Sequence, residues 1–156
     1  TSGAVAAGVA RLAMKRRPQN VPQRQAAAAV GQIHLMAVYE ELFARHQVAV
    51  AQILLTHDDL ANRRSYLNAR QTIQTLFLAG VVPVANENDT VVTAELTFGD
   101  NDNLSAQIAT VIEADLLVLL SDVPGLYTKN PALHADAELV DLVAEDGGAE
   151  VSMDGH

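Results

Sequence analysis

The polar side chains between Asn86 and Ala106 are the residues of this chain whose types and spacing could do chemistry. The carboxylates and asparagines of this stretch are Glu87, Asp89, Glu95, Asp100 and Asp102, with Asn86, Asn88, Asn101 and Asn103. A polar cluster this dense is costly to bury unless a ligand or hydrogen bonds satisfy it. A solvated acidic loop is the alternative. The cluster, however, lies between an apolar strand-like run and an apolar helical pattern, which favours a ligand site.

A helix is expected directly after the second half of this stretch. Residues 104–108 are good helix formers, and Asp102 or Asn103 is the expected N-cap. The positive end of the helix dipole would then face the loop, where it stabilises anions, and carboxylates beside it could hold Mg²⁺ or orient lysines. Residues 91–93 and 95–97 alternate like two short strands and could form a hairpin that covers a ligand.

The composition limits the classes of function. The 156 residues suffice for one domain with a sizeable core, and 49% hydrophobic with 4% aromatic residues suits an α/β domain with buried parallel strands. The net charge of −9 disfavours a nucleic acid or an anionic membrane as partner. The absence of cysteine excludes disulfides and a thiol nucleophile, and fits a cytoplasmic enzyme. We see no transmembrane run and no signal peptide.

Apolar periodicity gives an alternating order of helices and strands. We expect strands at 48–55, 81–85, 116–120 and 139–143, and helices starting after Thr1-Ser2-Gly3 and spanning about 23–46, 62–79 and 104–114. The run Ala26–Ala29 permits close packing, and the basic run Lys15–Pro18 is expected to be a solvated connection. Polar residues recur after the strands, at Thr56, Asn86 and Ser121. Because ligands of open α/β sheets bind beyond the carboxyl ends of the strands, we expect a site at that edge.

Several blocks of residues carry a resemblance to a known family. They are TSGAVAAG, AAVGQ, LLTHDDLANRRSYLNAR, VPVANENDTV, FGDNDNLSA and LLSDVPGLYTKNP, in this order from residue 1 to about 131. Together they closely resemble the amino acid kinase family, and the NEND and GDNDNLSA pair is specific to its glutamate-phosphorylating members. The resemblance implies a three-layer αβα sandwich around a mainly parallel sheet. It also implies phosphorylation of the γ-carboxylate of L-glutamate by MgATP to glutamyl 5-phosphate, the first step of proline biosynthesis.

The resemblance also assigns roles to individual residues. Ser2 matches a glutamate-binding serine, and Asp89 and Asn101 match residues that hold the α-amino and carboxylate groups of glutamate. Asp102 matches the aspartate that orients two catalytic lysines, and Asp100 lies beside it near the metal. The residues that match the nucleotide-binding loop are Ser121, Asp122, Gly125 and Tyr127.

The resemblance places both catalytic lysines outside residues 1–156. We therefore expect this chain to be an incomplete domain that is inactive as given. The protein from which it comes is expected to be a kinase, and many of these kinases carry a C-terminal RNA-modification-like domain. A homo-oligomer, with an interface from the helices at 23–46 and 62–79, and feedback inhibition by proline are also implied. The alternatives are another amino acid kinase, acting on acetylglutamate, aspartate or carbamate, and a non-catalytic amino-acid sensor that uses the same pocket.

Overall fold

A computed structural model describes residues 1–91, 101–121, 123–141 and 143. The chain divides into two compact units, Thr1–Leu117 and Val118–His156. The expected hairpin at 91–97 falls almost entirely on residues 92–100, outside the described residues. The cavity and the sheet described below all belong to the first unit.

Within the described residues, the sheet of the first unit consists of two parallel strands. β1 spans Ala49–Leu55 and β2 spans Val81–Glu87, with Ala49 opposite Val81 and Leu55 opposite Glu87. Both strands lie within two residues of their expected positions. Pro83 lies inside β2, opposite Ala51, so β2 is a strand that tolerates one residue without an amide donor.

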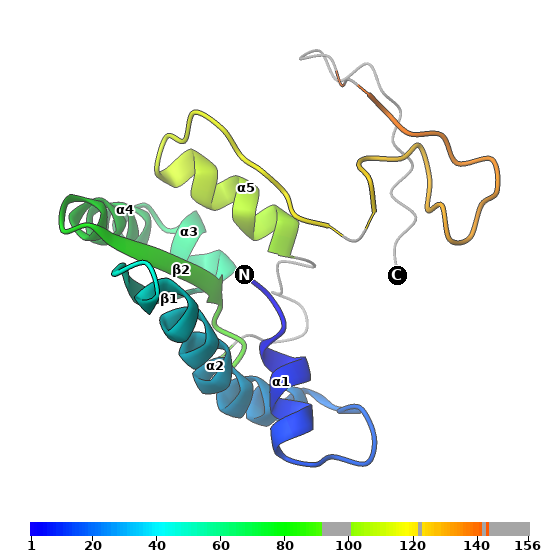
Figure 1. Ribbon diagram of the computed structural model, residues 1–156, viewed down its shortest axis with the longest axis horizontal. Coiled ribbons are helices and arrows are strands. Elements are labelled where there is room, and N and C mark those ends of the chain that lie inside the picture. The colour runs from blue at the N-terminus through cyan, green and yellow to red at the C-terminus, as the bar shows by residue number, and fades with distance from the viewer. Residues whose placement is uncertain (92–100, 122, 142, 144–156) are drawn as a thin grey trace. The chain divides into compact units, whose positions relative to one another are not determined.

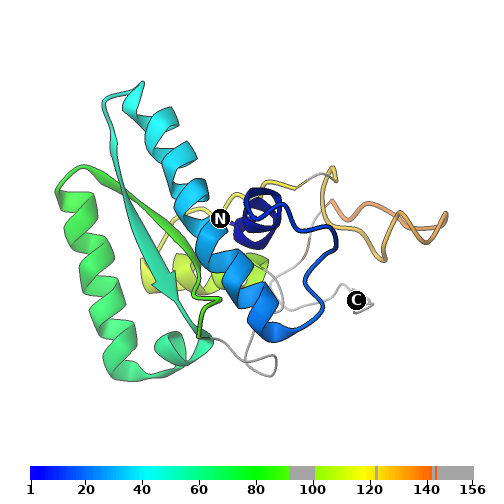
Figure 2. The ribbon, with the colours of Figure 1, turned by 90° about the horizontal axis from the view of Figure 1, so that it is seen from below.

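Helices cover both faces of this sheet. α2 (Val21–Ala44) lies on one face with α1 (Ala4–Arg11), and α4 (Arg63–Leu78) and α5 (Asn101–Val111) lie on the other (Figures 1 and 2). The short helix α3 (His57–Ala61) connects β1 to α4. Alternation along β2 explains the two faces, since Asn86 bonds to a side chain of α2 while the preceding residue, Ala85, lines a cleft with residues of α5. The expected αβα layering of an α/β fold is confirmed.

The contact between α1 and α2 is made by small residues. Ala4 of α1 and Ala27 and Ala28 of α2 are buried. A methyl group built on Gly8 would lie 1.7 Å from the carbonyl oxygen of Ala27, and one built on Gly31 would lie 1.7 Å from that of Ala4. The two backbones therefore touch, as the alanine run predicts, and side chains larger than hydrogen at these glycines have no space.

The helix boundaries follow local capping signals. The side chain of Asn20 accepts a hydrogen bond from the amide of Gln23 and caps the start of α2. The side chain of Asn62 likewise accepts from the backbone amides of the first turn of α4. Thr56 and Asp59 form a reciprocal capping box at the start of α3. Residues 56–59 are therefore a cap and the first turn of a short helix, with Asp58 and Asp59 in that turn. Gly80, with φ +72°, ends the segment after α4 as expected.

The N-cap expected at Asp102 or Asn103 is wrong. α5 already begins at Asn101, so Asp102 is the second helical residue and lies in its first turn. The reason is that Asn and Asp cap helices almost equally well, and a run of five such residues or glycine does not say which one the helix selects.

The strand expected at 116–120 is also wrong. These five residues form no strand, and their exposed fractions range from 42% to 96%. An apolar run becomes a strand only where another strand offers its backbone, and no described strand lies beside this one. The strand expected at 139–143 is reduced to one isolated antiparallel bridge between Tyr127 and Leu139 in the second unit.

Candidate functional site

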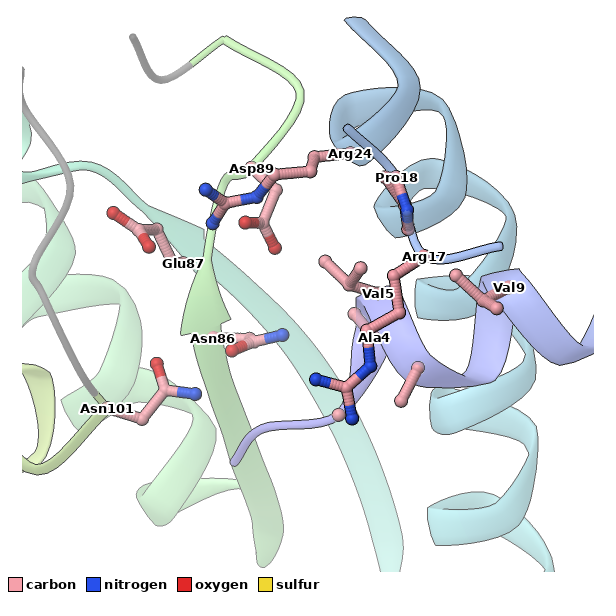
Figure 3. Close-up of a pocket in the computed structure, with 12 residues that line it drawn as sticks. Ala4, Val5, Val9, Arg17, Pro18, Arg24, Asn86, Glu87, Asp89 and Asn101 are labelled. Carbon is pink, nitrogen blue, oxygen red and sulfur yellow. The ribbon is translucent and has the colours of Figure 1, made fainter. Parts of the chain in front are cut away.

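A cavity of about 590 Å³ opens where α1, α2, the end of β2 and the start of α5 meet (Figure 3). Its lining residues are Gly3, Ala4, Val5, Ala6, Val9, Arg17, Pro18, Arg24, Asn86, Glu87, Asp89 and Asn101. One wall is apolar and comes from α1. The other walls carry amides and charges of both signs, which is the lining expected for a small polar ligand.

The end of β2 positions the acidic wall. The amide of Asn88 still donates to the carbonyl of Leu55 at 2.9 Å, so the strand pairing continues one residue beyond Glu87. The chain then turns, with the amide of Val91 donating to the carbonyl of Asn88 at 3.2 Å. This turn directs Asp89 back over the strand end, into the cavity. The polar residues after a parallel strand therefore converge at the carboxyl edge of the sheet, as the sequence predicts.

A hydrogen bond to a residue of α2 holds the side chain of Asn86 in place. It is 2% exposed, and its Nδ2 donates to Oε1 of Gln32 at 2.8 Å. Gln32 is 7% exposed, and its own Nε2 has no hydrogen-bond partner among the described residues. This buried hydrogen bond between two side-chain amides links the end of β2 to α2 and sets the orientation of Asn86 toward the cavity.

The surroundings of Asp89 disfavour the ionised form of its carboxyl group. Burial raises its pKa above the ordinary value of 3.8, the nearby charge of Glu87 raises it further, and the guanidinium of Arg24 opposes both effects. Titratable groups with pKa values shifted by burial and by specific neighbours cluster at functional sites. Asp89, selected from the sequence, is thus a half-buried acid inside the cavity.

Two arginines form the basic side of the cavity. Arg24 comes from the first turn of α2, and Arg17 comes from the loop between α1 and α2 (Figure 3). Residues 15–18 form a connection with Arg17 exposed, as expected, and Arg17 and Pro18 also line the cavity, which the sequence did not indicate. Sequence reasoning also missed Arg24, although one signal was present, since a cation in the first turn of a helix is unfavourable for the helix itself.

The other residues expected to bind substrate lie at or near the cavity. Asn101, the first residue of α5, lines it together with Asp89. Ser2 is exposed and does not line the cavity, although the next two residues do. Asp102 follows Asn101 in α5, is exposed and does not line the cavity either.

The start of the chain is held against the sheet and α2. The backbone nitrogen of Thr1 donates to the carbonyl of Ala85 at 2.8 Å, and Thr1 Oγ1 and Tyr39 Oη lie 2.8 Å apart. Gly3, with φ +98°, precedes α1, and no side chain caps that helix by a hydrogen bond. The hydroxyl of Ser2 is thus not used as a helix cap.

The residues expected to bind nucleotide belong to the second unit. The amide of Val123 donates to Oγ of Ser121 at 3.4 Å, and Tyr127 pairs with Leu139. A methyl group on Gly125 would lie 3.2 Å from the side chain of Leu139. Asp122 and the expected metal ligand Asp100 lie outside the described residues.

The described residues contain neither a cluster of metal ligands nor a helix that could span a membrane. Within residues 1–91, 101–121, 123–141 and 143, no three or more His, Cys, Asp or Glu side chains are grouped so that they could hold a metal ion. In the same described part of the chain, no helix combines the length and the apolar character needed to cross a membrane.

Comparison with known proteins identifies the family. The model of the amino acid kinase family matches residues 1–155. The chain belongs to the amino acid kinase family. Three relatives, each named glutamate 5-kinase, come from Marinomonas sp. (strain MWYL1) at 54% identity, Geobacter metallireducens at 53% and Myxococcus xanthus at 57%. The alignments cover 98%, 99% and 93% of this chain, but 41%, 44% and 38% of the relatives.

The chain therefore spans about two-fifths of the length of these relatives. Family membership applies to the part that is compared, and this part includes the whole cavity. The resemblance seen in the sequence blocks is thus confirmed at the level of the family, and the relatives carry the name of its glutamate-phosphorylating members.

Proposed function

We propose that the full-length protein transfers the γ-phosphoryl group of ATP to the γ-carboxylate of L-glutamate. One observation carries the proposal: the cavity joins Asp89 and Asn101, from the two polar blocks shared with glutamate-phosphorylating kinases, and lies beside the TSGA turn. The naming of the relatives as glutamate 5-kinases supports the same activity. The product is glutamyl 5-phosphate, and the reaction is the first step of proline biosynthesis.

Recognition of the amino acid follows from the lining. Asp89, when ionised, accepts hydrogen bonds from the α-ammonium group, and Asn101 offers both a donor and an acceptor. The hydroxyl of Ser2 contacts glutamate from the edge of the cavity. These roles stay proposals that the resemblance supplies.

The reaction needs positioning and charge neutralisation more than a nucleophile from the protein. An oxygen of the γ-carboxylate forms a bond to the γ-phosphorus, the bond from that phosphorus to the β,γ-bridging oxygen breaks, and ADP leaves with the electron pair. No proton moves, because the attacking group is a carboxylate. Asp102 is the residue proposed to orient the two lysines expected outside residues 1–156.

ATP and Mg²⁺ are part of the proposal. Mg²⁺ commonly binds one or two carboxylates together with substrate phosphates and water, so Asp100, with phosphate oxygens, is a sufficient protein contribution. Ser121, Asp122, Gly125 and Tyr127 are proposed to bind the nucleotide.

Further proposals concern the whole protein. Residues 1–156 form part of one amino acid kinase domain, and this part is inactive without the segments that bear the lysines. The full-length protein acts in the cytoplasm, forms a homo-oligomer and is inhibited by proline.

The test is a binding and turnover measurement on the full-length protein. Calorimetry with L-glutamate and, separately, MgATP is done for the wild type, Asp89→Asn and Asp115→Asn, an exposed control that removes the same charge. We expect Asp89→Asn to abolish glutamate binding and keep nucleotide binding, and Asp115→Asn to keep both. Turnover with acetylglutamate, aspartate or carbamate in place of glutamate, or glutamate binding without nucleotide binding, contradicts the proposal.

A further inference from the structure

Arg24 occupies a position that helix stability does not explain. It lies in the first turn of α2, and its amide donates to the carbonyl of Asn20 at 3.1 Å, as expected at a helix start. This end of the helix carries partial positive charge, so a cation there is unfavourable for the helix. The first turn of α2 contains no acidic residue to compensate. A residue that breaks a local rule without a visible structural gain is a candidate for function.

The side chain of Arg24 lies in the cavity, near the acidic wall. In Figure 3 its guanidinium lies beside the carboxylate of Asp89, and its charge lowers the pKa of that carboxyl group. Among the described residues, however, none of the ion pairs involves Arg24. The two side chains thus line the same cavity and attract each other without forming an ion pair, so both charges are available to a ligand in the cavity.

The covalent structure of an α-amino acid fits this pair of charges. Its ammonium and carboxylate groups are attached to the same carbon, so the groups that bind them must be neighbours. A carboxylate and a guanidinium at adjacent points of one cavity match this arrangement, and a guanidinium is well suited to hold a carboxylate through two parallel hydrogen bonds.

We propose that Arg24 binds the α-carboxylate of the amino-acid substrate and so selects α-amino acids over simple amines. The inference rests on the proposed function, because it assumes that Asp89 binds the α-ammonium group. The γ-carboxylate then extends away from Arg24 and Asp89. Arg24 is a specificity residue in this arrangement and takes no part in the phosphoryl transfer.

Arg17 offers a matched comparison on the same cavity. It also lines the cavity and is also exposed, but it comes from the loop before α2, and the pKa of Asp89 responds to Arg24 and Glu87. An arginine that merely attracts anions into the cavity would act from either position. An arginine that holds the α-carboxylate must be the neighbour of Asp89.

The experiment compares two ligands in the full-length protein. L-Glutamate has the α-carboxylate, and 4-aminobutyrate is the same molecule without it. Affinities for both are measured by calorimetry, or by competition in the kinase assay, for the wild type, Arg24→Gln, Arg24→Lys, Arg17→Gln and Asp89→Asn. We expect Arg24→Gln to weaken glutamate binding by roughly tenfold to a hundredfold, the loss of a charged hydrogen-bonding pair, and to leave 4-aminobutyrate unchanged.

The remaining variants complete the expected pattern. Arg24→Lys retains part of the glutamate affinity, and Arg17→Gln weakens glutamate binding less than Arg24→Gln does, because a lysine keeps the charge and Arg17 does not hold the α-carboxylate. Arg24→Gln raises the KM for glutamate with kcat nearly unchanged, because a group remote from the reacting carboxylate contributes equally to the ground state and the transition state. MgATP binding reports that each variant is folded.

The other outcomes separate the two proposals. If Arg24→Gln weakens both ligands equally, Arg24 acts only through Asp89, and the inference is wrong. If Arg24→Gln keeps full glutamate affinity while Asp89→Asn loses it, the inference is also wrong and the proposed function stands. If the wild type binds no glutamate, or Asp89→Asn still binds it, the proposed function itself fails.

Discussion

The cavity has one wall made by α1 and α2 and another made by the end of β2, and the two differ in what their side chains do. The helical wall presents mainly Ala4, Val5, Ala6 and Val9 to the cavity, and it is held in place by glycine and alanine residues of α1 and α2 whose backbones touch. The strand wall is built from Asn86, Glu87 and Asp89, which gain little from burial and in the case of Asp89 resist ionisation. The first wall gives the cavity its shape, and the second gives it chemistry.

This difference separates stability from binding. Changes at the glycine and alanine contact between α1 and α2 should lower the free energy of unfolding and affect binding only through the fold. Changes in the strand wall should affect binding strongly, and stability in a way that depends on pH. The predictions below test this separation, starting with the largest expected effect on stability.

Gly31→Ala, which adds a single methyl group, is expected to cause the largest loss of stability. The added carbon would lie 1.7 Å from the carbonyl oxygen of Ala4 and 2.4 Å from the amide nitrogen of Gly8, so α1 and α2 must separate. We expect a loss of about 3 kcal/mol in the free energy of unfolding, at the upper end for overpacked cores. Urea denaturation followed by circular dichroism measures it.

Ala29→Val is the control for this prediction. Ala29 lies on the same helix, two residues earlier, but is exposed. Extra carbon there should cost less than about 1 kcal/mol, mainly from the lower helix propensity of valine. Equal stability of Gly31→Ala and the wild type would show that the two helices are not in backbone contact.

Gln32→Met tests the link between the two walls. The substitution removes the acceptor for Nδ2 of Asn86 and leaves that buried amide unpaired, at a cost of about 1–3 kcal/mol. The cost is reduced because the unpartnered Nε2 of Gln32 is removed as well. We expect a loss near the lower end of this range, measured by urea denaturation.

The double variant Gln32→Met with Asn86→Leu is the matched comparison. Replacing both partners by apolar groups leaves no buried group unsatisfied, so the pair should recover part of the lost stability. If the stability lost in the double variant equals the sum of the losses in the two single variants, the Gln32–Asn86 hydrogen bond does not couple α2 to β2.

The elements that carry their own signals could be predicted from the sequence. Both strands of the sheet and the helices α2 and α4 follow from apolar periodicity along the chain. The acidic wall could be predicted because polar residues after a parallel strand must gather at its carboxyl edge. The alanine run indicated that α2 could pack closely, but not that its partner is α1 or that Gly8 and Gly31 make the contact.

What could not be predicted depends on partners distant in the sequence. The run at 116–120 has the pattern of a buried strand, but pairing requires a neighbouring edge, which periodicity does not supply. Arg17 and Arg24 reach the cavity through the packing of α1 on α2, so their role is not visible in a run of basic residues near a loop. The start of α5 was displaced because several adjacent residues cap equally well.

Asp89→Asn should stabilise the chain at neutral pH. Since burial and Glu87 raise the pKa of Asp89 in the folded state, the folded protein binds its proton more tightly than the unfolded chain does. Stability therefore falls as pH rises from the ordinary value of 3.8 through the raised pKa, and the asparagine variant escapes this loss. Urea denaturation should show that Asp89→Asn is more stable than the wild type at about pH 7 and that this difference disappears below pH 3.8.

Asp115→Asn is the control for the pH effect, since this exposed residue lies outside the cavity and its replacement should change stability little at either pH. A constant difference between Asp89→Asn and the wild type across the whole range would mean that Asp89 is not stressed by burial. The gain in stability should accompany the loss of glutamate binding, so this wall trades stability for function.

Arg24→Gln is expected to have the smallest net effect on stability, because two effects oppose each other. Removing a cation from the first turn of α2 stabilises the helix by about 0.3–1 kcal/mol at any pH. Removing the charge that favours ionised Asp89 raises the pKa of that carboxyl group further, which destabilises the protein only where Asp89 would ionise. The variant should thus exceed the wild type in stability below about pH 3.8 and lose this advantage toward neutrality. In the Asp89→Asn background the second effect is absent, so Arg24→Gln should stabilise by the same amount at every pH, and a pH-dependent difference there would show that Arg24 acts on a group other than Asp89.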